Sequence, residues 1–133
     1  MNAQGYAGRY TQAQVTSVDQ KQLLLLMFDG GLKFLGLARE ALAVGDALGF
    51  ANNLSRSQAI ISELLSTLDR NAGGVIAADL TRLYEFMLLH LTEANAKRSV
   101  RHVDEVRRVF AIIAGAYREI LAPPVGRTAS AAA

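Results

Sequence analysis

Apolar residues recur at helical spacing along most of the chain, in four segments separated by links of only a few residues. Links containing glycine, at 45–46 and 71–74, are expected to end the first and second helices. Helices joined by such short links have to run antiparallel to their neighbours. The spacing therefore predicts an all-α fold, an antiparallel up-down four-helix bundle with an N-terminal arm or a short extra helix. The expected helices span about residues 20–44, 47–70, 75–98 and 100–121.

Residues at the two ends of this pattern predict how the chain is divided. Asp19 can accept hydrogen bonds from amides of the first turn and so begin the first helix, which leaves residues 1–18 as an N-terminal arm. Two consecutive prolines stop the last helix, and residues 123–133 are predicted to form a flexible tail. Residues 19–122 then form the one bundle domain that a chain of 133 residues with 51% apolar content can support.

Each expected helix carries a stripe of apolar residues that predicts its core face. Gly30 and Gly31 lie inside the first helix, where small residues permit a neighbouring helix to approach closely. The expected core positions are Leu24, Met27, Gly31, Phe34 and Ala38; Leu54, Ile61, Leu65 and Leu68; Ile76, Leu80, Leu83, Tyr84, Met87, Leu91 and Ala94; and Val103, Val106, Phe110, Ile113, Tyr117 and Leu121.

Other apolar residues fall outside these stripes. They are Leu25, Leu26, Leu32 and Leu37 in the first segment, and Phe86 and Leu89 in the third. Together they amount to more apolar surface than a monomeric bundle hides, and such an excess usually marks a partner site. The alternative is that the first helix is central and is covered by the N-terminal arm.

The residues that would support enzymatic or metal chemistry are missing or wrongly spaced. The chain has no cysteine, which excludes a disulfide scaffold, a thiolate zinc site and an iron–sulfur cluster. His90 and His102 follow Met87 and Ser99 by three residues, so neither belongs to the Glu-x-x-His pair of a di-metal carboxylate bundle. A glycine-rich phosphate loop and a Gly-x-Ser-x-Gly elbow are also missing from the sequence. We therefore expect no enzymatic activity, no cofactor and no metal, with both histidines half-exposed at the surface.

Charge and hydropathy restrict the partners and the compartment. A formal net charge of +2 is too small to indicate nucleic acid as the main partner. The longest apolar runs are far shorter than the roughly 20 residues that span a bilayer, so we expect a cytoplasmic protein without membrane insertion. A histidine phosphotransfer module, which is also a helical bundle, stays as an alternative. His90, however, lies between Leu89 and Leu91, without the lysine and glycine expected beside an acceptor histidine.

The string Gln22-Leu-Leu-Leu-Leu-Met-Phe-Asp-Gly30 resembles the first-helix signature of the flagellin-specific export chaperones, the FliS family. The resemblance covers about residues 6–121. It implies a helical bundle in the bacterial cytosol that binds the C-terminal segment of flagellin. Binding would prevent premature polymerisation and keep the subunit competent for flagellar type III export. The matching motifs continue, at the same spacing, in Gly45-Asp46, Gly73-Gly74-x-Ile76-Ala77, Leu83-Tyr84-x-Phe86-Met87 and Leu91-x-x-Ala94-Asn95.

The family also has a characteristic tyrosine in an N-terminal arm that folds over the binding surface of the free chaperone, and Tyr10 matches that position. The expected partners are the C-terminal segment of flagellin and the flagellar export apparatus, with the chain itself a monomer or a weak homodimer. A structural bundle that homodimerises through its first helix is the competing interpretation. The predicted client contacts are Tyr10, Val15, Leu25, Leu26, Phe28, Leu32, Phe86 and Leu89.

Overall fold

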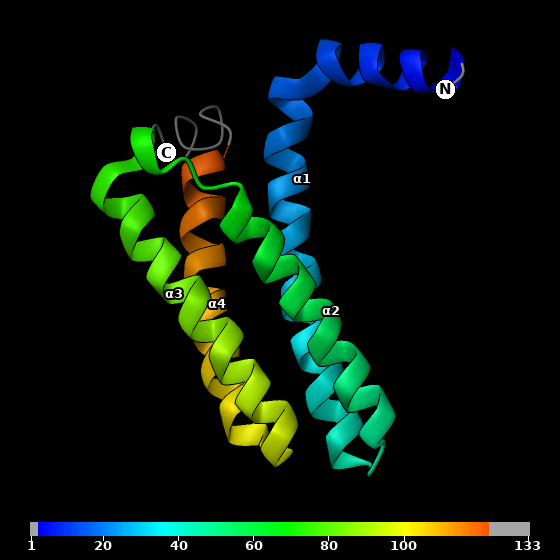
Figure 1. The fold of residues 1–133 in the computed structure, drawn as a ribbon, viewed down its shortest axis with the longest axis vertical. Coiled ribbons are helices and arrows are strands. Elements are labelled where there is room, and N and C mark those ends of the chain that lie inside the picture. Colours follow the sequence, from blue (N-terminus) through cyan, green and yellow to red (C-terminus); the bar gives the residue numbers. More distant parts are fainter. Residues whose placement is uncertain (1–2, 123–133) are drawn as a thin grey trace, which may run out of the picture.

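A computed structural model of the chain describes the backbone of residues 3–122 and the side chains of residues 20–122 except Arg70. Consecutive helices run antiparallel, as Figure 1 shows. α1 packs against α2 and α4, and α3 packs against the same two helices from the opposite corner. The predicted all-α four-helix bundle is therefore confirmed. Its helices are α1 (Ala3–Ala43), α2 (Ala47–Ser66), α3 (Arg70–Lys97) and α4 (Val100–Leu121).

α1 begins much earlier than the sequence predicted. The expected start lay near Gln20, whereas the helical backbone already starts at Ala3. The first turns of α1 extend away from the other three helices before the chain bends into the bundle (Figure 1). The side chains of Tyr10 and Val15, two of the predicted client contacts, lie outside the described residues.

The link between α2 and α3 differs from its prediction for a local reason. α2 ends at Ser66 rather than near residue 70. The carboxylate of Asp69 accepts hydrogen bonds from the backbone N–H groups of Asn71 and Ala72, both at 3.1 Å, and so starts α3 ahead of the glycine pair. Gly74 then bends the helix, with φ +56° and ψ −129°, a conformation that a side chain would oppose.

The core of the bundle confirms most of the predicted stripes. On α4 the expected residues from Val103 to Ile113 are buried, and Tyr84, Met87 and Leu91 fill the α3 side. On α1 the buried stripe is rotated from the expected one. Phe28 and Leu35 are fully buried, whereas the side chains of Leu24, Met27 and Phe34 are only partly covered. Packing across the bundle explains the rotation, because the Phe28 ring lies 5.3 Å from the Phe110 ring and 4.9 Å from the Tyr117 ring.

Gly31 permits this close packing of α1 against α4. A Cβ atom at Gly31 would lie 2.5 Å from a ring carbon of Phe110, closer than two carbon atoms can approach. The expectation that small residues allow close helix approach is confirmed here.

We expect Gly31→Ala to destabilise the bundle relative to Gly115→Ala. Both changes add the same methyl group to a helix, but a Cβ at Gly115 meets nothing within 4 Å. The gain in helix propensity is common to both variants. The difference between their free energies of unfolding therefore reports the overpacking at Phe110, which we expect to cost about 1–3 kcal/mol. Urea unfolding of the two variants measures this difference. Equal midpoints would show that the Phe110 ring moves aside without cost.

Candidate functional site

The link from α2 to α3 and the end of α4 lie at the same end of the bundle (Figure 1). A cavity opens there, lined by residues of α1, of that link, of α3 and of α4. This end cavity has a volume of about 600 Å³. Tyr117 from α4 contributes the one phenol hydroxyl among its lining residues, and burial raises the pKa of that group, which keeps it neutral. The apolar residues that line it are Leu23, Leu24, Met27, Leu68, Ala72, Ile76, Ala77 and Leu80.

A row of exposed apolar side chains continues from the end cavity along α3. We call it the α3 stripe, and it consists of Ile76, Leu83, Phe86 and Leu89. At about 100° per residue, their spacings of seven, three and three residues turn the row gradually around the helix, by about 140° from Ile76 to Leu89. Ile76 also lines the end cavity, so the cavity and the stripe meet at this residue.

Two members of the α3 stripe correct the core prediction. Ile76 and Leu83 were expected in the core, but their side chains are 72% and 39% exposed. Leu83 directly precedes the buried Tyr84, so it points about 100° away from the core face. A signal for this was present in the sequence, since Ile76, Leu83 and Phe86 share one helical side.

The predicted client contacts do not all gather at this surface. Phe86 and Leu89 lie in the α3 stripe, and Leu26 is exposed on α1, across the bundle from α3. Leu25 is partly buried, and Leu32 is partly buried beside a second hollow of about 500 Å³ between α1 and α4.

Phe28 was also predicted as a client contact, and the structure corrects this. Its side chain is 0% exposed and packs between the rings of Phe110 and Tyr117. A client cannot reach it without opening the core.

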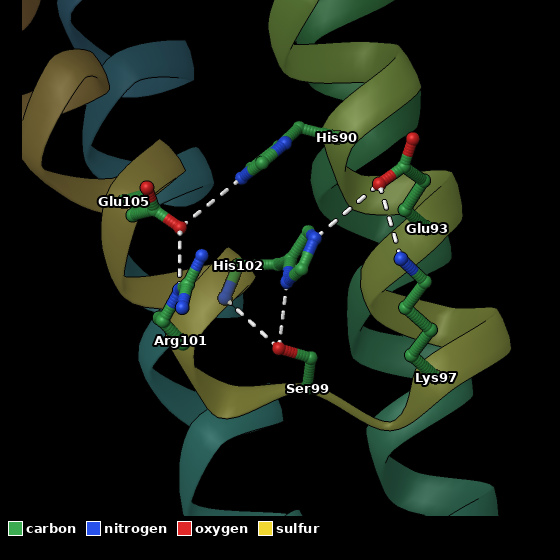
Figure 2. Close-up of polar contacts among 7 residues, drawn as sticks. All are labelled: His90, Glu93, Lys97, Ser99, Arg101, His102 and Glu105. Atoms are coloured by element: carbon green, nitrogen blue, oxygen red, sulfur yellow. Dashed lines mark hydrogen bonds and ion pairs between the residues drawn. The ribbon is translucent and has the colours of Figure 1, made fainter.

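A polar cluster occupies the α3–α4 side of the bundle, near the turn between the two helices (Figure 2). Nε2 of His90 lies 3.4 Å from Oε1 of Glu105, and Nε2 of His102 lies 3.3 Å from Oε2 of Glu93. The histidine of each helix thus faces the glutamate of the other. The hydrogen bond with His90 is the main cause that holds the pKa of the Glu105 carboxyl below its usual value. Desolvation opposes it, and a hydrogen bond with Arg101 and the charge of Arg101 lower the pKa further.

Ring stacking explains why both histidines are more buried than the predicted half-exposed residues. The His90 ring lies 4.9 Å from the Phe86 ring and 4.3 Å from the His102 ring. The side chain of His90 is only 17% exposed and that of His102 only 13%. A phosphotransfer module requires an exposed acceptor imidazole. His90 does not fit this role because its side chain is only 17% exposed and its Nε2 is engaged by Glu105.

Fold and surface together define a class of protein, a helical bundle with an exposed apolar surface of the kind that marks a partner site. Within residues 3–122, none of the helices combines the length and hydropathy needed to cross a bilayer.

Comparisons with known proteins identify the family. The family model for flagellar protein FliS matches residues 2–124. The chain is 34% identical to the flagellar secretion chaperone FliS of Salmonella typhimurium over 116 residues, which cover 86% of each chain. It is 32% identical to the Escherichia coli protein of the same name over 91% of this chain and 90% of the relative. The Bacillus subtilis FliS is 34% identical over 73% of this chain and 71% of the relative. The chain therefore belongs to the FliS family, a family of flagellar secretion chaperones and not of enzymes.

Proposed function

We propose that the chain is a cytosolic export chaperone that binds the C-terminal amphipathic segment of flagellin. Binding prevents premature polymerisation of flagellin and keeps it competent for flagellar type III export. The observation that carries this proposal is the exposed apolar surface of the end cavity and the α3 stripe, which meet at Ile76. An amphipathic segment gains from covering such a surface, because its own apolar face leaves water at the same time.

The shape of the surface favours an extended client over a compact one. The end cavity lies at one end of the bundle, and the α3 stripe leads away from it along the helix over 14 residues, from Ile76 to Leu89. At 1.5 Å per residue this path is about 20 Å long. Leu26 and Leu32 add apolar positions on other sides of the bundle, consistent with a segment that wraps around it.

The N-terminal arm, residues 1–18, is proposed to fold back over the end cavity in the free chaperone, from the extended position that its first turns have in Figure 1. Gln20 and Leu23 line the cavity, so the arm joins the bundle at the cavity's edge. Tyr10 and Val15 would then supply apolar side chains that the client displaces, a population shift set by the difference in affinity. Residues 123–133 are proposed as a flexible tail.

The proposed mechanism requires no nucleotide and no chemical step, and the free chain acts as a monomer or a weak homodimer. Reversible burial of apolar surface suffices, since the client only has to be protected and later released. The flagellar export apparatus is the proposed second partner, to which the loaded chaperone delivers its client.

The test is to compare intact flagellin with flagellin that lacks its C-terminal segment. We expect the intact client to form a complex and the truncated one to bind at least tenfold more weakly, because the apolar surface loses its ligand. Light scattering during co-elution from a sizing column measures complex formation and oligomeric state together. A stable dimer that ignores both forms of flagellin would support the homodimer interpretation instead.

A further inference from the structure

The polar cluster between α3 and α4 brings together three side chains of the types that bind transition metals. One nitrogen each from His90 and His102 and one oxygen from Glu105 lie within 4.8 Å of one another. Figure 2 shows the three side chains converging from two helices. Their placement follows from the sequence, because a His-x-x-Glu pair occurs on each helix, at His90–Glu93 and at His102–Glu105. Residues three apart share one face of a helix, and here the two faces meet.

We propose that His90, His102 and Glu105 bind one divalent transition-metal ion, with Zn²⁺ as the ion that fits best. Imidazole nitrogen and carboxylate oxygen are the donors that zinc accepts from a chain without cysteine. Zinc has no geometric preference of its own from d electrons, so it tolerates donors that arrive from two different helices. Mg²⁺ and Ca²⁺ prefer oxygen ligands only, and two imidazoles make this site unsuitable for them.

The distances support a four-coordinate ion. Bonds of about 2.0–2.1 Å to zinc place neighbouring tetrahedral ligands roughly 3.3–3.4 Å apart. Nε2 of His90 and Oε1 of Glu105 are already separated by 3.4 Å. The ring nitrogen of His102, within 4.8 Å of both, comes into range by rotation of its side chain. Water fills the fourth position, since Oε2 of Glu93, 3.3 Å from Nε2 of His102, is also paired with Lys97 at 3.8 Å.

The surroundings of the cluster hold its ligands in place. Ser99, the N-cap of α4, accepts a hydrogen bond from the backbone N–H of His102 at 3.2 Å, and its Oγ lies 2.7 Å from Nδ1 of the same residue. Such contacts orient a histidine for metal binding. The nearest competing cation is Arg101, 3.4 Å from Glu105, and its side chain is highly exposed and free to swing into solvent.

A metal bound here would tie α3 to α4 beside their connecting turn, at the end of the bundle opposite the end cavity (Figure 1). Because the ion binds the folded chain and the ligands separate on unfolding, it would stabilise the bundle. It would do so beside the far end of the α3 stripe, where the His90 ring stacks on the Phe86 ring.

The experiment uses the full, untagged chain after treatment with a chelator. Calorimetric titration with ZnCl₂ is expected to give one ion per chain, and saturating zinc is expected to raise the Tm by about 5 °C or more, whereas MgCl₂ does neither. Substitution of Co²⁺ provides a direct readout, since four-coordinate Co²⁺ has an intense visible absorption band at longer wavelength than the weak band of aqueous Co²⁺.

The variants His90→Gln, His102→Gln and Glu105→Gln are each expected to weaken zinc binding at least tenfold. Glu85→Gln is the matched control, because it removes an exposed α3 carboxylate that is not part of the cluster, and it should bind zinc like the parent chain. Circular dichroism checks that each variant folds. If a histidine variant unfolds, the zinc affinity of Glu105→Gln alone tests the proposal. Absence of the Co²⁺ band in the parent chain, or zinc binding that survives Glu105→Gln and His90→Gln, would overturn the proposal.

Discussion

Replacing Phe28 by alanine is expected to lower the free energy of unfolding by about 3–5 kcal/mol, the usual cost of removing a fully buried phenylalanine ring. The side chain is 0% exposed, and its ring lies 5.3 Å from Phe110 and 4.9 Å from Tyr117. Its removal leaves a cavity at the contact between α1 and α4, where Gly31 has already brought the two helices as close as their atoms allow. Urea unfolding followed by circular dichroism measures the change.

Leu26→Ala is the matched control for this prediction. It removes an apolar side chain from the same helix two positions earlier, but one that is 64% exposed. We expect its free energy of unfolding to stay within about 0.5 kcal/mol of the parent chain. If Phe28→Ala were as stable as the parent chain and lost only client binding, Phe28 would be a client contact and the packing described above would be wrong.

The sequence predicted the helices and their order well because these depend on local signals. Apolar spacing and short links are sufficient to define four antiparallel helices. The link at Gly45 and Asp46 formed as expected, with Gly45 at φ +78° and the Asp46 carboxylate accepting from the Gly49 N–H at 2.9 Å. On α4 the apolar stripe is narrow, so the pattern alone identified Phe110 as core.

The orientation of α1 could not be predicted in the same way. Leucines lie on most of its circumference, so spacing does not single out one buried face. Contacts with Phe110 and Tyr117 decide that Phe28 is buried, and both partners are more than 80 residues away in the sequence.

The histidine cluster depended on contacts between helices as well. The sequence lacks the Glu-x-x-His pair at both histidines, but it carries His-x-x-Glu on α3 and again on α4. Only the rotation of the two helices against each other brings His90 to Glu105 and His102 to Glu93. The repeated pair is visible in the sequence, whereas the contact between the two pairs is not.

The double variant Ile76→Glu with Leu83→Glu is expected to weaken binding of the flagellin C-terminal segment at least 100-fold, which corresponds to about 2.7 kcal/mol. Both positions lie in the α3 stripe, and Ile76 also lines the end cavity. A bound apolar segment would have to cover two carboxylates without partners, and the lost anchors add to that cost. Fluorescence anisotropy of a labelled client peptide measures the affinity.

The control is Val44→Glu with Leu48→Glu, which introduces the same two charges at exposed apolar positions near the α1–α2 turn, at the other end of the bundle (Figure 1). We expect this variant to bind the client within a factor of about two of the parent chain. Because glutamate suits a solvent-facing helical position, both double variants should remain folded. Equal loss of affinity in the two would mean that net charge, not the α3 stripe, governs binding. Unchanged affinity in both would indicate that the client binds at the α1 leucines instead of the α3 stripe. The two measurements therefore locate the binding surface as well as testing it.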